Sequence, residues 1–222
     1  MSETLTVHHL NNSRSQRILW LLEELGLVYE VRHYRREPDM RAPEELREIH
    51  PLGKSPVVTH EKRMIAETGA IIEYILSLAP DHGMMPTEGS EHYWQARHFL
   101  HYAEGSAMPP LFLSLVLGMI PERAPFFIKS MLSTAMERVE SSFVAPEINK
   151  HLDHWENAIG ESGWFAGPNL SIADVMMSFP VETAGKRFGY DRHPKLREFL
   201  GRIHERDAYR RALKRGGPYD YA

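Results

Sequence analysis

The sequence predicts an α/β domain followed by an all-α domain, and three features support this division. Within residues 1–79, short β-branched runs alternate with segments whose apolar side chains recur at helical spacing. Residues 80–90 are dense in Pro and Gly and show little periodicity, which is typical of a linker. The stretch 91–222 has the pattern of successive helices. We therefore expect an α/β domain over 1–79, a linker over 80–90 and a helical domain over 91–222.

The α/β domain is expected to run strand, helix, strand and then strand, strand, helix. Its first helix carries an apolar stripe of Ile18, Leu19, Leu22 and Leu25 and stops at Gly26. The other expected elements are strands over 5–8, 29–34, 57–59 and 64–66, a charged loop with a short helix over 35–47, and a helix from Thr68 to about Leu78. This order is that of a thioredoxin-like domain.

The all-α domain is expected to begin with a long apolar helix over 93–117. Pro109 and Pro110 lie inside this stretch and predict a kink or a break, because proline has no amide hydrogen. Further on, Ser171 and Asp174 have the spacing of a capping box, which is a structural signal for the start of a helix. The remaining helices are expected over 124–143, 147–159, 194–204 and 208–214.

The composition is that of an ordinary globular chain and argues against several classes of function. The chain has 222 residues, 42% of them hydrophobic, which is enough for a packed core. A formal net charge of −4, with both signs mixed throughout, leaves no basic stripe for nucleic acid. No apolar run approaches the ~20 residues of a membrane span, and the first residues do not resemble a secretory signal. We therefore expect a cytoplasmic protein with neither a nucleic-acid nor a membrane partner.

The chain contains no cysteine, and this limits the possible chemistry. Disulfides, thiolate-ligated metals and mechanisms based on a protein thiol are all removed. Two histidine pairs, His98 with His101 and His151 with His154, have helical spacing, but neither comes with an identifiable third ligand. No metal site is expected. A reactive sulfur would have to come from the ligand.

Two short runs look like a wall that binds a peptide. In the first, Pro56 opens a β-branched run and suits a fixed turn or the cis form, which leaves the backbone of Ser55 free to pair with a ligand. In the second, Glu67 and Thr68 precede apolar positions at helical spacing. The exposed amides of that helix start would hold a carboxylate, and Glu67 would receive an ammonium. One small zwitterion satisfies both.

This pattern resembles the glutathione transferase family, and the resemblance covers nearly the whole chain. It implies an α/β N-terminal thioredoxin-like domain plus an all-α C-terminal helical domain. It further implies that Ser55, Glu67 and Thr68 bind glutathione, with Lys54 and Arg41 near its glycyl carboxylate. Glutathione would be the cosubstrate, and the protein would be a homodimer. Family members that use an active-site cysteine are excluded.

The catalytic group expected from the resemblance is Ser13, in the loop after the first strand. The string from Ser13 to Arg17 resembles the first loop of serine-type and related bacterial transferases. The Ser13 hydroxyl would donate a hydrogen bond to the glutathione thiolate. Asn11, Asn12 and Ser15 are alternatives, and Ser13 or Ser15 could instead cap the following helix. The loop contains no tyrosine, which disfavours a tyrosine-type mechanism.

The second substrate is expected to be a hydrophobic electrophile bound between the domains. Tyr102 and Ser106, four residues apart on one helix face, are candidates for its pocket or are core residues, and Phe112 lies beyond them. The C-terminal residues 219–221 either cover this pocket or are frayed.

The expected activity is conjugation of glutathione to the electrophile in detoxification, with possible glutathione-dependent peroxidase activity. The alternatives are a noncatalytic ligand-binding or regulatory protein of the same fold, and an isomerase or lyase that uses glutathione as a cofactor.

Overall fold

The structure, a computed structural model, describes residues 4–80 and 83–222. Its N-terminal part is a four-stranded sheet in the order β2-β1-β3-β4. The strands are β1 (Leu5–Leu10), β2 (Tyr29–Tyr34), β3 (Val57–His60) and β4 (Arg63–Ala66). Strand β1 runs parallel to β2 and antiparallel to β3, and β3 runs antiparallel to β4. This is the thioredoxin-like arrangement that the order of the elements predicts.

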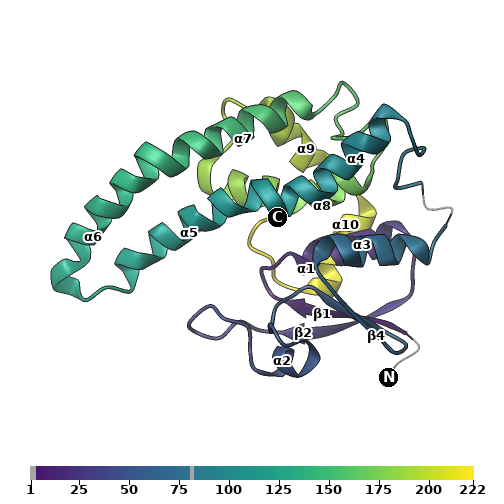
Figure 1. Ribbon diagram of the computed structural model, residues 1–222, viewed down its shortest axis with the longest axis horizontal. Coiled ribbons are helices and arrows are strands. Elements are labelled where there is room, and N and C mark those ends of the chain that lie inside the picture. The colour runs from purple at the N-terminus through teal and green to yellow at the C-terminus, as the bar shows by residue number, and fades with distance from the viewer. Residues whose placement is uncertain (1–3, 81–82) are drawn as a thin grey trace.

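Helices cover both faces of this sheet. Figure 1 shows α1 (Ser15–Glu24) and α3 (Thr68–Ser77) on one face and the short α2 (Glu45–Ile49) on the other. Strand β1 contributes side chains to both faces of the sheet, because successive residues of a strand point to opposite faces. Val7 joins the main core beneath α1, whereas Leu10 joins Leu46 of α2 in a small separate cluster. The loop that follows β1 is therefore anchored on both sides of the sheet.

The helical part contains two long continuous helices that form a projecting antiparallel hairpin (Figure 1). The first consists of α4 (Glu91–Tyr102), a π-helical segment η1 (Ala103–Ala107) and α5 (Met108–Glu122). The second consists of α6 (Phe126–Val139), a π-helical segment η2 (Glu140–Val144) and α7 (Ala145–Ala158). The separate helices expected over 124–143 and 147–159 are therefore one helix.

The π-helical segments explain how the prolines are accommodated. Pro109 and Pro110 fall in the first turn of α5, directly after η1, so the expected break takes the form of one wide turn. Pro146 has the same position after η2 at the start of α7. Each wide turn precedes residues that lack an amide hydrogen, and the helix continues without the sharp break that an interior proline otherwise causes.

Helix α8 (Ile172–Phe188) is the central helix of this part, and its start is built as the sequence predicts. The Ser171 side chain and the Asp174 carboxylate form a capping box, in which Asp174 Oδ2 accepts from the Ser171 amide at 2.8 Å. Asp174 Oδ1 also accepts from the amide of Phe165 at 2.8 Å. Burial raises the pKa of Asp174 to about 7, against the effect of these hydrogen bonds. The box thus joins the start of α8 to the preceding loop.

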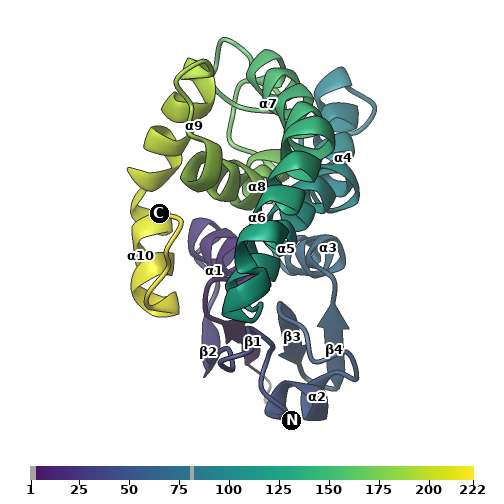
Figure 2. The same cartoon turned by 90° about the vertical axis from the view of Figure 1, so that its left-hand side faces the viewer.

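The last helices return the chain to the sheet. After α9 (Pro194–His204), α10 (Asp207–Gly216) packs beside α1, as Figure 2 shows. Trp20 of α1 and Tyr209 of α10 meet edge to face at 5.4 Å, and both side chains are buried. The core consequently runs without interruption from the sheet into the helical part.

In the part of the chain that the structure describes, one helix is long and apolar enough by length and composition to cross a membrane. It is the continuous helix over 91–122, and 33% of its most apolar window is buried. Core helices of soluble proteins meet the same criterion. This finding qualifies the expectation that no apolar segment approaches the length of a membrane span.

Candidate functional site

Three loops meet at one edge of the sheet, and the strand register brings them together. His8 lies opposite Val57, and Val57 lies opposite Ala66. The end of β1, the start of β3 and the end of β4 therefore share this edge. The loop that carries Ser13 leaves the end of β1. The Ser55–Pro56 turn leads into the start of β3, and α3 begins just after the end of β4. The backbone segments that carry Ser13, Ser55 and Glu67 thus converge at this edge.

Ser55 ties its turn to the end of β1. Its hydroxyl donates to the carbonyl of His8 at 2.8 Å and accepts from the amide of Leu10 at 3.2 Å. The Ser55–Pro56 peptide bond is cis. Just upstream, Gly53 has φ +55°, and a β-carbon there would stand 2.7 Å from Cγ of Arg47, so glycine suits this position. The turn is held by side-chain contacts, and the Ser55 backbone lies beside them at the edge of the sheet.

Glu67 starts α3 from an unusual backbone conformation. Its φ is +69°, a region that residues other than glycine rarely occupy and that costs about 1–3 kcal/mol. The Glu67 carbonyl accepts from the amide of Ile71 at 2.9 Å, while its carboxylate is exposed. Thr68 beside it is buried. The strained backbone presents a carboxylate and a helix N-terminus together at this edge.

The two basic residues expected near the glycyl carboxylate are both exposed. Lys54 directly precedes Ser55 at this edge. The side chain of Arg41 is 80% exposed and lies 3.6 Å from the carboxylate of Asp39, its close neighbour in the chain. Contacts from the body of the protein therefore do not determine the direction of Arg41.

Ser13 lies at the start of α1 within a buried polar chain. Its Oγ is 2.7 Å from Oγ of Ser15 and accepts from the Ser15 amide at 3.3 Å. Ser15 Oγ is in turn 2.8 Å from Nδ1 of His9. Burial and the nearby His33 lower the pKa of His9 to about 4, which keeps the ring neutral near pH 7. Sequence reasoning identified the serines but missed His9, because nothing in the strand pattern distinguishes it from His8.

The two asparagines of the loop are engaged elsewhere. Asn11 Oδ1 accepts from the amide of Arg36 at 2.8 Å, which joins the loop to the end of β2. Asn12 has φ +51° and donates to Asp220 Oδ2 at 2.6 Å, while its own Oδ1 accepts from the Asp220 amide at 3.0 Å. Both side chains thus hold the loop in place.

Two arginines and one glutamate surround the start of α1. Arg17 is 1% exposed, pairs with Glu104 of η1 and donates to the carbonyl of Met176 at 2.7 Å. Arg14 lies 2.9 Å from the other oxygen of Glu104. Both guanidinium groups also lie over the ring of Phe179, at 5.8 Å and 5.6 Å from its centre. Glu104 is not among the residues expected from the sequence. Two basic residues three apart on one helix face were the signal that an acid lies opposite.

The contacts of Tyr102 are those of a packing residue, which is one of the two alternatives that the sequence leaves open. Its hydroxyl bonds to Nδ1 of His151 and accepts from Nε1 of Trp155 at 2.8 Å, both on α7. Figure 1 shows α7 on the far side of the helical part from the sheet. Glu104, two residues later, occupies the face that meets α1. Tyr102 therefore lies in the packing between α4 and α7 and does not face Ser13. Ser106 is exposed on η1, and Phe112 is 59% exposed on α5.

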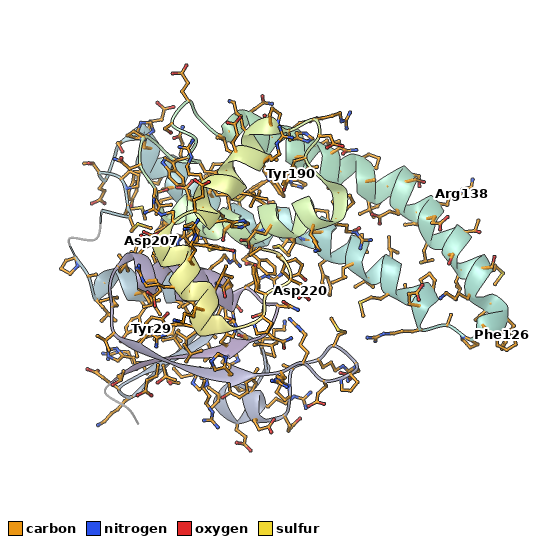
Figure 3. All side chains as sticks on the ribbon, turned by 180° about the vertical axis from the view of Figure 1, so that it is seen from behind. Tyr29, Phe126, Arg138, Tyr190, Asp207 and Asp220 are labelled. Atoms are coloured by element: carbon orange, nitrogen blue, oxygen red, sulfur yellow. The ribbon has the colours of Figure 1, made fainter. Side chains whose placement is uncertain are left out.

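The C-terminal segment is packed against the molecule. The Tyr219 hydroxyl donates to the buried carboxylate of Glu182 at 2.6 Å. Asp220 forms the two contacts with Asn12, and Tyr221 packs edge-on against an aromatic ring of α8 at 5.6 Å. Figure 3 shows Asp220 beyond α10, between the helical part and the sheet. The segment therefore borders the loop that carries Ser13.

This fold and site define a two-domain protein in which a thioredoxin-like sheet edge faces an all-helical domain. The chain belongs to the glutathione S-transferase family. The model of the family's N-terminal domain matches residues 3–77, and a model of its C-terminal domain matches residues 124–211. Members of this family use glutathione as a substrate. Among the described residues, no group of three or more His, Asp or Glu side chains could hold a metal ion.

Known proteins resemble the chain over nearly its whole length. Glutathione S-transferase 1 of Saccharomyces cerevisiae is 32% identical over 92% of both chains. Glutathione S-transferase 3 of Schizosaccharomyces pombe is 29% identical over 95% of this chain and 87% of its own. A crystal structure of a glutathione S-transferase from Actinobacillus pleuropneumoniae is 27% identical, with a TM-score of 0.78 over 98% of this chain and 95% of that one.

Proposed function

We propose that this protein binds glutathione at the sheet edge and activates its thiol for conjugation to a hydrophobic electrophile. One observation carries the proposal: Ser13, Ser55 and Glu67 lie in the connections next to strand ends that meet at the same edge. Glu67 would receive the γ-glutamyl ammonium, and Thr68 with the start of α3 would receive its carboxylate. The Ser55 backbone would pair with the cysteinyl unit, and Lys54 and Arg41 would attract the glycyl carboxylate.

The energy needed to activate the thiol is within reach of these groups. An unperturbed thiol with a pKa near ~8.5 is about 3% ionised at pH 7. Lowering that pKa by about two units requires roughly 2.7 kcal/mol of preferential binding of the anion. One hydrogen bond to the charged sulfur contributes ~1.5–3 kcal/mol, and the start of a helix ~0.3–1 kcal/mol.

The charges around Ser13 favour an anion. Arg14 and Arg17 carry two positive charges and Glu104 carries one negative charge, so the cluster has a net positive charge. The ion pair of Arg17 and Glu104 is partly buried, and solvent screens its charges less than it screens charges at the surface. This net positive charge supports a thiolate site beside Ser13 and not on the outer face of the sheet.

The electrophile would lie between the loop of Ser13 and the long first helix of the helical domain. Ser106 and Phe112 are its proposed contacts, since both are exposed on that long helix. The reaction would add the glutathione sulfur to an electrophilic carbon, and the same thiolate would reduce organic hydroperoxides.

We further propose a homodimer that acts in the cytoplasm in detoxification. The dimer is supported by large apolar side chains exposed along the hairpin, which include Phe126, Phe127, Met131 and Phe143. Light scattering at several concentrations would measure the mass in solution, and a mass that remains that of one chain would contradict the dimer.

One observation favours the noncatalytic alternative. Ser13 is 4% exposed and its hydroxyl already has a partner in Ser15, which fits a residue that only holds the loop. An isomerase or lyase that returns glutathione would share the thiolate and would differ only in its second substrate.

A pH titration of bound glutathione separates these functions. The ultraviolet absorbance of the thiolate is followed in the wild type and in Ser13→Ala. A thiol pKa well below ~8.5 in the wild type that rises by at least one unit in Ser13→Ala supports activation by Ser13. A lowered pKa that the substitution leaves unchanged would assign activation to another loop group. Binding without any lowering would support the noncatalytic alternative.

A further inference from the structure

A hydrogen-bond chain runs inward from Ser13 and ends on a histidine that the proposed reaction leaves unused. Ser13 Oγ is 2.7 Å from Ser15 Oγ, which is 2.8 Å from Nδ1 of His9. These three residues are 4%, 0% and 2% exposed, respectively. Water has little access to the chain, so the protein itself determines the direction in which each hydroxyl points.

The number of hydrogens in this chain limits what Ser13 can do. Two hydroxyl oxygens 2.7 Å apart share a hydrogen that one of them donates. If Ser13 donates it, the Ser13 hydroxyl points inward and presents only lone pairs to a sulfur. If Ser15 donates it, the Ser13 hydrogen is free to point at the sulfur. Ser15 has only one hydroxyl hydrogen, and Ser13 Oγ at 2.7 Å is a nearer acceptor for it than the carbonyl of Leu10 at 3.4 Å. When Ser15 donates to Ser13, a hydrogen on Nδ1 of His9 must complete the 2.8 Å contact with Ser15.

The His9 ring can support either direction. A neutral imidazole carries one ring hydrogen, on Nδ1 or on Nε2. Gly216 of α10 lies against the ring, and its backbone forms a hydrogen bond that favours the protonated form. A β-carbon at Gly216 would stand only 3.3 Å from Cε1 of His9. The Gly216 backbone and the Ser15 hydroxyl thus compete for the ring hydrogen.

We propose that His9 is the positioning residue for thiolate binding: a hydrogen on its Nδ1 turns the Ser15 and Ser13 hydroxyls outward, so that Ser13 donates to the glutathione sulfur. This inference rests on the proposed role of Ser13. No net proton transfer to the chain is involved. The thiol hydrogen leaves to solvent, and Ser13, Ser15 and the neutral ring each retain one hydrogen.

His8 offers a matched control on the same strand. It is 3% exposed, and burial together with the charge of Arg32 lowers its pKa to about 4 as well. Its side chain lies on the opposite face of the sheet, 2.9 Å from the hydroxyl of Tyr34 and 3.1 Å from Oγ1 of Thr59. Replacing His8 therefore removes a similar buried ring without touching the Ser13 chain.

Nitrogen-15 NMR of the histidine rings tests the inference directly on the wild-type protein. Spectra are recorded at pH 7 with and without glutathione, and the His9→Phe variant identifies the His9 signals. The expected result is a neutral His9 ring with its hydrogen on Nδ1 in the complex with ionised glutathione. A ring hydrogen on Nε2 in that complex would overturn the inference.

The pKa of bound glutathione gives an independent test. Ser15→Ala and His9→Phe are expected to raise it by about one unit, a tenfold loss of thiolate below the pKa. His9→Asn, which retains a side-chain N–H donor, should raise it less, and His8→Phe should leave it unchanged. Thermal unfolding identifies the folded variants. If His9→Phe does not fold, His9→Asn identifies the His9 signals in the NMR spectra, and Ser15→Ala supplies the pKa comparison.

The outcomes separate this inference from the proposed function. A thiol pKa that rises in Ser13→Ala but not in Ser15→Ala or folded His9→Phe contradicts the inference alone. A rise of the same size in His8→Phe would also contradict it, because the effect would then follow from loss of packing. A wild type that does not lower the thiol pKa contradicts the proposed function itself.

Discussion

Helices α1 and α8 begin with similar sequence patterns and differ in how those patterns are used. Ser13 is followed three residues later by Gln16, and Ser171 by Asp174, so each start has a serine with an acceptor side chain at the spacing of a capping box. At α8 the box is complete. At α1 both polar atoms of the Gln16 amide are buried and have no partner among the described residues, and Gly216 lies beside that side chain.

The difference shows what releases a serine for function. At α8 the Asp174 side chain accepts hydrogen bonds from the backbone amides of Phe165 and Ser171. The first turn of α1 contains no acidic residue, and Arg14 and Arg17 add positive charge there. The acid that balances them, Glu104, comes from η1. One helix start is closed by local sequence, and the other is completed by tertiary contacts and can receive an anion.

The largest expected effect comes from removing the acid beside α1. Glu104→Ala would leave the buried Arg17 without its ion pair, which typically costs about 3–5 kcal/mol. Glu73→Ala is the control, because it breaks the more exposed 2.7 Å pair with Arg97 and should cost at most about 1 kcal/mol. Urea denaturation measures both free energies of unfolding. Equal losses would show that burial does not distinguish the two pairs.

Protonation of Asp174, at the start of α8, should also affect the free energy of unfolding strongly. The pKa of Asp174 is about 7 in the folded chain, above the ordinary aspartate value of 3.8, so the folded state binds the proton more tightly. This residue's contribution to the free energy of unfolding therefore falls as pH rises from about 4 to 7, by up to about 4 kcal/mol, and is constant above that range.

Asp174→Asn isolates that contribution from other titrating groups. His8 and His9 act in the opposite direction, because their lowered pKa values make stability rise between about pH 4 and 6.5. Denaturation of the wild type and the variant at several pH values gives their difference. A difference independent of pH would show that the Asp174 pKa is not raised.

A substitution at a third helix start, that of α3, tests the proposed glutathione site. Glu67→Gln is expected to weaken glutathione binding more than tenfold, since a charge-assisted contact contributes ~1.5–3 kcal/mol. Glu61→Gln is the matched control, because Glu61 is also exposed and also has a positive φ, +51°. Calorimetry measures both affinities. An unchanged affinity in Glu67→Gln would refute the assignment of the ammonium to Glu67.

The smallest expected effect is that of Ser171→Ala, and comparing it with Ser13→Ala separates a capping serine from a functional one. Ser171→Ala should lower the free energy of unfolding by about 1 kcal/mol and leave glutathione affinity unchanged. Ser13→Ala should instead change the thiol pKa more than the stability. Thermal unfolding and calorimetry on both variants measure the two properties. A loss of glutathione affinity in Ser171→Ala without a loss of stability would contradict the capping role.

Local signals allowed much of the fold to be predicted from the sequence. Strand β2 and helix α9 have the predicted bounds, and the box at Ser171 forms as expected, because alternation, proline at a helix start and capping all act within a few residues. The candidates Ser55 and Glu67 came from local motifs as well, whereas Ser13 came from the resemblance of its loop to a known family. The prolines of the hairpin were also visible, but the sequence does not indicate that a π-helical turn precedes them.

Contacts between distant segments decided the rest. The sequence determined which residue types stand at the start of each helix and strand, and with them the order of the elements and the composition of the sheet edge. Only the tertiary structure decided that Tyr102 turns toward α7, that Glu104 meets Arg17, and that Asp220 holds Asn12. The physical reason is distance along the chain: periodicity specifies the face of a helix, whereas the neighbour on that face is fixed only when the helices pack.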